Sequence, residues 1–267
     1  MVTMISKTLP KTWKLFVKHK NYLIPIVILE ALFLIALLIL QLYFFVPSSE
    51  IAIKLGEIIT KEAGDLSSSE IYNIDAKLKS NPEFMISYRL LLIYILLFLL
   101  GALAAWIILR SGVWFLAHKS AGIKQGFLRY AIKFKLITLF WFIMSAIILF
   151  AYSAISGSGE TILPLFSPAF ATTIIFIIMI VMIYFSQLSF ALITQEKTIR
   201  SAFKTGVRNA KKLITVFLFN ILISFVAITL PLNWINSYPK ITIAIALIFS
   251  IPALAFARLH IITACQK

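Results

Sequence analysis

Charge is scarce in this sequence: only 13% of its 267 residues are Asp, Glu, Lys or Arg, whereas 61% are hydrophobic. A soluble globular domain carries charge on about a quarter of its residues, so the composition excludes an ordinary soluble protein. The single cysteine, Cys265, excludes an intramolecular disulfide. The sequence also lacks a phosphate-binding glycine loop, a serine nucleophile elbow, a zinc-protease helix, a CxxC pair and an aspartate pair. We therefore expect no enzyme, no cofactor and no metal.

Six long stretches carry almost no charge. They are Asn21–Val46 (interrupted only by Glu30), Leu90–Leu109, Leu136–Gly159, Thr161–Gln195, Leu213–Pro239 and Ile241–Ala257. A helix needs about 20 residues, at about 1.5 Å each, to cross a hydrocarbon layer of about 30 Å. Five stretches meet that length, and the sixth meets it if Arg258 and His260 extend to the headgroups. The sequence therefore predicts one all-α domain over residues 1–267, a polytopic integral membrane bundle of six transmembrane helices at about 21–46, 86–117, 136–156, 168–194, 212–233 and 240–262.

Basic residues gather on one side of this predicted bundle. Of the 25 Lys and Arg, 19 lie in residues 1–20, 110–135, 197–212 and 258–267, whose connections carry only one acid, Glu196. Short loops rich in Lys and Arg stay in the cytoplasm, so we expect a multi-pass protein of the cell (plasma) membrane with both termini cytoplasmic. Such a surface attracts anionic membrane lipids. It lacks the modules and interleaved aromatics that nucleic acid requires, and it identifies no protein partner.

Two basic segments repeat each other. Residues 123–140 and 199–217 share Ile-basic-x-small-Phe followed by Lys-Leu-Ile-Thr-(Leu/Val)-Phe, with one extra residue in the second copy, and residues 9–20 form a weaker third copy. Each copy predicts a short basic amphipathic helix, the first at about residues 6–20, that lies in the headgroup plane and leads into a transmembrane helix. The alternative is that these lysines and arginines merely anchor the spans. The candidate headgroup contacts are Lys11, Lys14, Lys124, Arg129, Arg200, Lys204 and Arg208.

A polar residue occurs in each predicted span at a similar depth, about 9–15 Å from its basic end. These residues are Glu30, Arg110, Ser145, Gln187, Asn220 and Arg258. An isolated carboxylate in lipid is costly, so we expect Glu30 to pair with Arg110 or Arg258. Two interpretations of this intramembrane polar layer remain open. It joins the helices to one another, or it lines a cytoplasm-facing cavity for an anionic or amphiphilic ligand.

Residues 47–85 form the one sizeable hydrophilic connection, and we expect it on the external side as a helical loop. Ser48 and Ser49 predict the start of a short amphipathic helix that ends at Gly64. The capping box Ser67–Glu70 predicts the start of a second short helix. Both helices are too small for a core of their own. We therefore expect them to lie on the outer membrane surface or over the bundle.

A family resemblance rests on one basic segment. Residues 190–212 read Phe-Ala-Leu-Ile-Thr-Gln-Glu-Lys-Thr-Ile-Arg-Ser-Ala-Phe-Lys-Thr-Gly-Val-Arg-Asn-Ala-Lys-Lys. This loop and helix resembles an element of a broad group of six-helix membrane proteins, which includes the membrane domain attached to some bacterial glycerophosphodiester phosphodiesterases and many stand-alone bacterial and archaeal proteins. The resemblance covers the bundle but not residues 47–88, and no phosphodiesterase residue carries over. It implies a membrane domain that acts in envelope or lipid handling.

These patterns lead to a ranked expectation of function. We expect a non-enzymatic integral membrane protein that organises or binds anionic lipid at the cytoplasmic face. The alternative is a small transporter or permease that uses the intramembrane polar layer. A lipid-modifying enzyme ranks third, because the sequence offers neither a nucleophile nor a metal constellation.

Overall fold

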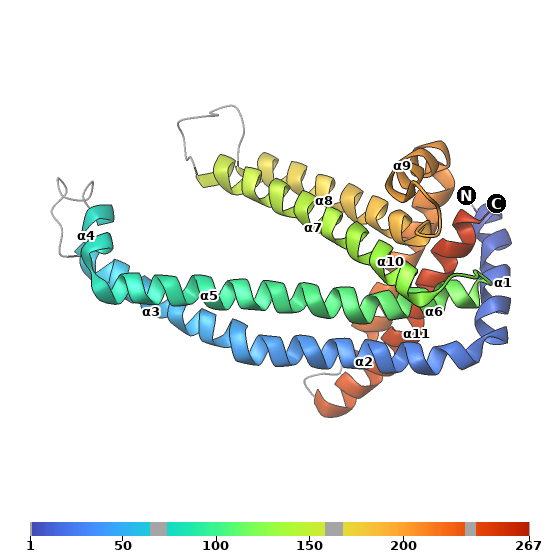
Figure 1. The fold of residues 1–267 in the computed structure, drawn as a ribbon, viewed down its shortest axis with the longest axis horizontal. Coiled ribbons are helices and arrows are strands. Elements are labelled where there is room, and N and C mark those ends of the chain that lie inside the picture. The colour runs from blue at the N-terminus through green and yellow to red at the C-terminus, as the bar shows by residue number, and fades with distance from the viewer. Residues whose placement is uncertain (1, 65–73, 158–167, 233–238, 267) are drawn as a thin grey trace. The chain divides into compact units, whose positions relative to one another are not determined.

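The computed structural model describes residues 2–64, 74–157, 168–232 and 239–266, and within these residues it contains helices and no strand. Figure 1 shows the helices in chain order. They are α1 (Val2–Lys18), the 3₁₀ turn η1 (Lys20–Tyr22), α2 (Leu23–Leu40), the π-helical η2 (Gln41–Phe45), α3 (Val46–Gly64), α4 (Ile74–Ser80), α5 (Pro82–Ala105), the π-helical η4 (Trp106–Arg110), α6 (Ser111–Ser120), α7 (Phe127–Gly157), α8 (Pro168–Ala191), α9 (Thr198–Arg208), α10 (Ala210–Leu232) and α11 (Pro239–Cys265).

Five of these helical segments are long and apolar enough to cross a membrane. They are Lys20–Gly64, Pro82–Ser120, Phe127–Ser153, Thr172–Ala191 and Ala210–Ala227. A shorter apolar segment, Phe249–Cys265, lies in α11. Five such segments among the described residues indicate a membrane-embedded protein, because a helix satisfies its own backbone groups while it exposes apolar side chains to lipid.

The chain forms two compact units. The bundle unit comprises Met1–Glu30 and Arg110–Lys267, and the hairpin unit comprises Ala31–Leu109. The chain thus leaves the bundle unit directly after Glu30 and re-enters it directly at Arg110.

The hairpin unit pairs the helix formed by α2, η2 and α3 with α5. A glycine permits close approach: a Cβ added at Gly101 of α5 would lie 2.5 Å from a methyl of Leu40. Near the loop end of the hairpin, Lys77 forms an ion pair with Glu62 at 3.0 Å. Asn81 caps α5 by accepting from the backbone N–H groups of its first turn, at 3.0 and 3.2 Å, and its amide donates to Glu62 at 3.1 Å. These contacts fix the loop ends of α3 and α5 to each other.

The expected start of a separate helix at Ser48 and Ser49 is wrong. The chain stays helical from Leu23 to Gly64, and both serine hydroxyls donate to carbonyls three residues earlier in that helix. Pro47 follows directly after the π-helical η2, whose wider turn relieves the clash of the proline ring with the preceding turn. The capping box at residues 67–70 lies outside the described residues.

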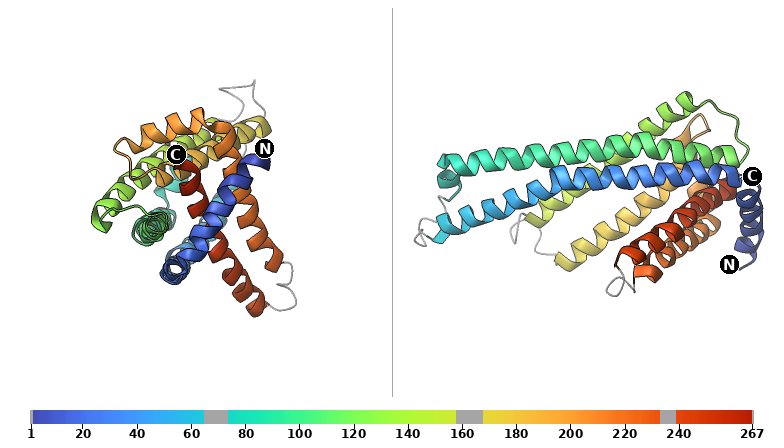
Figure 2. Two further views of the ribbon diagram at one scale, coloured as in Figure 1. Left: turned by 90° about the vertical axis from the view of Figure 1, so that its right-hand side faces the viewer. Right: turned by 90° about the horizontal axis from the view of Figure 1, so that it is seen from below.

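The bundle unit is built from antiparallel helix pairs. Helices α7 and α8 lie side by side, as do α10 and α11, and α11 also contacts α1, α6 and α8 (Figures 1 and 2). Gly122, with φ of +82°, ends α6 by a turn in which its N–H donates to the Lys119 carbonyl. The basic residues 123–135 do not form a separate helix, because α7 begins at Phe127 and continues unbroken to Gly157. Helix α9, in contrast, is separated from α10 at Asn209.

Candidate functional site

Two arginines and one glutamate meet in the interior of the bundle unit. Glu30 lies on α2, Arg110 ends η4 and Arg258 lies on α11. Arg110 Nη1 donates to Glu30 Oε2, while Arg258 Nη1 forms an ion pair with Glu30 Oε1. The side chains are 2%, 11% and 10% exposed, respectively. The sequence predicts a pair, and the structure contains a triad with one positive charge in excess.

An apolar layer lies one helical turn from this triad. Ile26, Val113 and Ala255 form a buried cluster, and they are four residues before Glu30, three after Arg110 and three before Arg258. Each of the three helices therefore places a buried apolar side chain within about one helical turn of its charged side chain. Gly112 allows the close approach, because a Cβ there would lie 2.9 Å from a methyl of Leu29. The three charged side chains are at most 11% exposed, so each charge depends on its partners.

A second polar network joins α1, α10 and α11. Asn220 Nδ2 donates to the Ala257 carbonyl at 3.0 Å, which leaves its Oδ1 to accept from His260 Nδ1 at 2.9 Å. His260 Nε2 then accepts from the Thr8 hydroxyl at 3.1 Å, an assignment that follows from the network. The expected extension of Arg258 and His260 to the headgroups is wrong: His260 is fully buried and both side chains bind within the protein.

A third network surrounds His118, which is buried. Its Nδ1 lies 2.9 Å from the Trp114 carbonyl and 3.2 Å from the Tyr130 hydroxyl, and its Nε2 lies 3.2 Å from the Ala191 carbonyl. These contacts join α6, α7 and the end of α8. Sequence reasoning missed both buried histidine networks, because Tyr130 and Ala191 around His118 and the partners of His260 lie on other helices and share no spacing with the histidines along the chain.

The remaining members of the predicted polar layer lie apart from the triad. Ser145 donates to the Trp141 carbonyl within α7. Gln187 is half-buried on α8. No hydrogen bond in the described part of the chain connects either side chain, or Asn220, to the triad. Of the predicted residues, the structure brings together Glu30, Arg110 and Arg258.

The seven predicted headgroup contacts are all exposed, and none forms an ion pair with another described residue. Helix α9 shows how the fold sorts them. It exposes Arg200, Lys204 and Arg208 and buries Thr198, Ala202 and Gly206. Residues four apart share one face of a helix, so the basic residues form one stripe and the small residues form the stripe that packs on α8.

A polar pocket of about 470 Å³ lies beside this basic stripe. Its lining combines the ends of α8 and α11 with α9, and one arginine, Arg208, faces it together with neutral polar side chains. No acidic residue lines it, and the nearby Lys212 ammonium donates to the Ala264 carbonyl at 2.7 Å. The neutral polar residues in the lining are Thr194, Gln195, Thr205, Asn209 and Gln266.

Comparison with known proteins assigns no function to these residues. No family model, curated protein or solved structure matches the chain. A function must therefore be inferred from the chemistry of the chain itself. Exposed cations and an acid-free polar pocket favour an anionic ligand, whereas both arginines of the buried triad already pair with Glu30.

Proposed function

We propose that this protein is a non-enzymatic membrane protein that binds anionic lipid through the basic surface of its bundle unit. The exposure of all seven basic side chains supports the proposal, since none is neutralised by a described acidic residue. Anionic headgroups attract each well-placed Lys or Arg by about 1 kcal/mol. The polar pocket at Arg208 offers a place for a phosphate. The role agrees with what the resemblance of residues 190–212 implies.

The proposal includes a six-span topology in the cell membrane with both termini in the cytoplasm. Helix α11 has 27 residues, or about 40 Å at about 1.5 Å per residue, which is enough for a sixth span. With six spans, Lys11, Lys124 and Lys204 share one side and residues 47–85 lie on the other. Positively charged short connections stay in the cytoplasm, so the side that carries Lys11, Lys124 and Lys204 is the cytoplasmic one.

Labelling tests this topology. In a Cys265→Ser background, we expect Lys204→Cys to react with a membrane-impermeant maleimide only after the cytoplasmic face is opened. Lys61→Cys should react in intact cells. Both positions are exposed on helices that the structure describes, so access depends on the membrane alone. Reaction of both cysteines from the same compartment would refute the six-span arrangement.

Neutralising the basic surface tests lipid binding. We expect the combined Lys124→Gln, Arg129→Gln, Arg200→Gln and Lys204→Gln variant to lose most of its preference for phosphatidylglycerol over phosphatidylcholine. Four cations contribute up to about 4 kcal/mol, or up to about a thousandfold in affinity. The preference of the wild-type protein should also weaken as ionic strength rises. Native mass spectrometry of the full chain, equilibrated with mixed vesicles, measures both effects.

A matched control removes the same charge from the hairpin unit. The control variant carries Lys54→Gln, Lys61→Gln, Lys79→Gln and Arg89→Gln, and these four residues are exposed. Lys54 pairs with Glu83 at 2.8 Å, but an exposed pair contributes at most about 1 kcal/mol to stability. We expect the control to keep the lipid preference. Equal losses in both variants, or no loss in the first, would contradict the proposal.

Transport is the second candidate function, and the triad is the observation that favours it. A buried cluster with one cation in excess could attract an anion crossing the membrane. A structural role is better supported, since both arginines already bind Glu30 and all three triad residues lie within about one helical turn of the buried cluster of Ile26, Val113 and Ala255. The two roles predict different results for a Glu30 substitution.

A further inference from the structure

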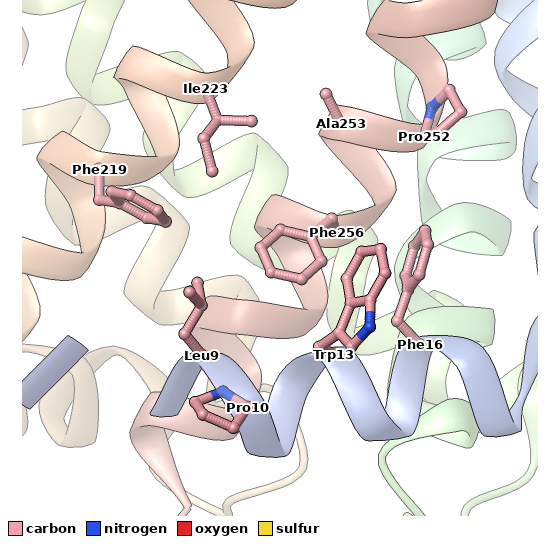
Figure 3. A pocket seen from close by; sticks show the side chains of 9 residues that line it. All are labelled: Leu9, Pro10, Trp13, Phe16, Phe219, Ile223, Pro252, Ala253 and Phe256. Atoms are coloured by element: carbon pink, nitrogen blue, oxygen red, sulfur yellow. The ribbon is translucent and has the colours of Figure 1, made fainter. Parts of the chain in front are cut away.

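An apolar groove of about 650 Å³ lies between α1 and the α10–α11 pair. Figure 3 shows α1 along one edge, with Leu9, Trp13 and Phe16 pointing toward α10 and α11. Pro10 completes the α1 side of the groove. Helix α10 contributes Phe219 and Ile223, and α11 contributes Pro252, Ala253 and Phe256. All nine side chains are apolar or aromatic.

Two sets of contacts hold the groove open by fixing α1. Thr8 binds His260 at one end of the contact between α1 and α11. Further along α1, the rings of Trp13 and Phe16 pack on Phe256, with centroid distances of 6.3 and 5.7 Å. Helix α1 is therefore fastened on both sides of Leu9. The groove between it and α10 is a built feature of the bundle unit rather than the gap beside a loose helix.

The position of the groove limits what can occupy it. Phe219 and Ile223 lie nine and thirteen residues along α10 from Ala210, which is about 14 and 20 Å at about 1.5 Å per residue. In the proposed topology this depth lies within the hydrocarbon layer, where lipid chains are the solvent. The occupant that this layer supplies is a lipid acyl chain.

Positive charge beside the groove favours a lipid with an anionic headgroup over a lipid without net charge. Lys11 and Lys14 adjoin the groove residues Pro10 and Trp13 in the chain, and both are exposed on α1. They lie on the helix face that turns away from the groove, as expected for an amphipathic helix between headgroups and chains. An anionic headgroup held near these lysines would leave its acyl chains at the level of the groove.

We infer that this groove holds one acyl chain of an anionic phospholipid from the cytoplasmic leaflet. The inference rests on the proposed function, because it places the chain of the same lipid whose headgroup the basic surface attracts. A lipid tail is as apolar in the bilayer as in the groove, so no hydrophobic gain drives its transfer. Retention depends instead on close packing against the aromatic rings and on the charge of Lys11 and Lys14.

Filling the groove with a larger side chain tests the inference. Ile223→Trp places an indole in the groove, whereas Ile221→Trp makes the same change on the same helix at a position that is 47% exposed and outside the groove. Both full-length proteins are equilibrated with vesicles of phosphatidylglycerol and phosphatidylcholine and transferred to detergent. Native mass spectrometry counts the retained phospholipids. We expect one in the wild type and in Ile221→Trp, and none in Ile223→Trp.

A second measurement does not depend on the folding of a groove variant. Phosphatidylglycerol with brominated chains should quench the fluorescence of the wild type more strongly than that of Trp13→Phe, because Trp13 lines the groove. Equal quenching of the two proteins, or equal lipid retention by Ile223→Trp and Ile221→Trp, would overturn the inference. A dimer that Ile223→Trp converts to a monomer would overturn it too, by showing that a second copy covers the groove.

The two proposals fail in different ways. If the wild type retains phosphatidylcholine as well as phosphatidylglycerol and Ile223→Trp retains neither, the groove binds a chain but the preference for anionic lipid is absent. If the preference is present and Ile223→Trp keeps its lipid, the basic surface binds headgroups without the groove.

Discussion

Glu30→Leu should destabilise the protein by about 3–5 kcal/mol, the cost of removing one partner from a buried ion pair. The substitution leaves Arg110 and Arg258 in the interior of the bundle unit without the carboxylate that joins them. Two buried cations then repel each other in a medium that screens charge poorly. Denaturant unfolding of the purified protein, followed through its helical circular dichroism, measures the loss.

The matched control replaces all three members of the triad. In Glu30→Leu, Arg110→Leu and Arg258→Leu combined, no buried charge remains, and apolar side chains of similar size usually cost little or even stabilise. We expect this triple variant to recover most of the stability that Glu30→Leu loses. Glu30→Leu with wild-type stability and an abolished solute flux would instead identify the triad as part of a transport pathway.

Gly206→Val should release α9 from α8. A Cβ at Gly206 would lie 2.7 Å from Phe185 Cε1 and 2.8 Å from Leu188 Cδ1, and valine adds two methyls beyond it. The Tyr184 hydroxyl donates to the Gly206 carbonyl at 3.1 Å, so the same displacement breaks a buried hydrogen bond. Overpacking costs about 1–3 kcal/mol. We expect faster amide hydrogen exchange in α9 and a weaker lipid preference, since Arg200, Lys204 and Arg208 lose their common orientation.

A glycine without neighbours provides the comparison. A Cβ at Gly56 of α3 meets nothing within 4 Å, and alanine in the middle of a helix is favoured over glycine by about 0.5–1 kcal/mol. Gly56→Ala should therefore stabilise the hairpin unit slightly and leave α9 unchanged. Exchange in α9 that Gly206→Val does not accelerate would show that this contact does not position the basic stripe.

The apolar helices were predictable because the signal is local. An uncharged run of membrane-crossing length forms a helix whatever its neighbours are, since lipid offers the backbone no other partner. The predicted stretch Leu90–Leu109 is helical, and so is the described part of the next stretch, from Leu136 to Gly157. The exposure of Lys11 and Lys204 is also a local property, because it follows from the spacing of charged and apolar residues along a single helix.

Features that depend on which helices become neighbours were not predictable. The sequence shows that Glu30 needs a cation, but only the packing of α2, η4 and α11 brings two arginines to it. Likewise, the sequence indicates that Asn220 is a polar residue within a span, but it does not indicate that His260 is the partner of Asn220. The sequence does not predict that the helix continues through Pro47, because a π-helical turn has no clear sequence signature.

The two basic segments that repeat in sequence differ in structure for a geometrical reason. The second copy has one extra residue, and one residue turns an α-helix by about 100°. Residues 123–126 of the first copy precede α7, which carries the rest of that copy unbroken, whereas the second copy is helical on both sides of a break at Asn209 between α9 and α10. The break lets the basic stripe of α9 and the buried face of α10 face different neighbours.

The π-helical segment Trp106–Arg110 shifts the phase of the helix that contains it. A π turn holds one residue more than the α turn it replaces, so the side chains after it point about 100° away from their direction in an uninterrupted α-helix. The direction of the Arg110 and Val113 side chains therefore depends on the number of residues in this short segment. Loss of one residue from it would turn Arg110 by about 100° about its own helix axis and take the guanidinium away from Glu30.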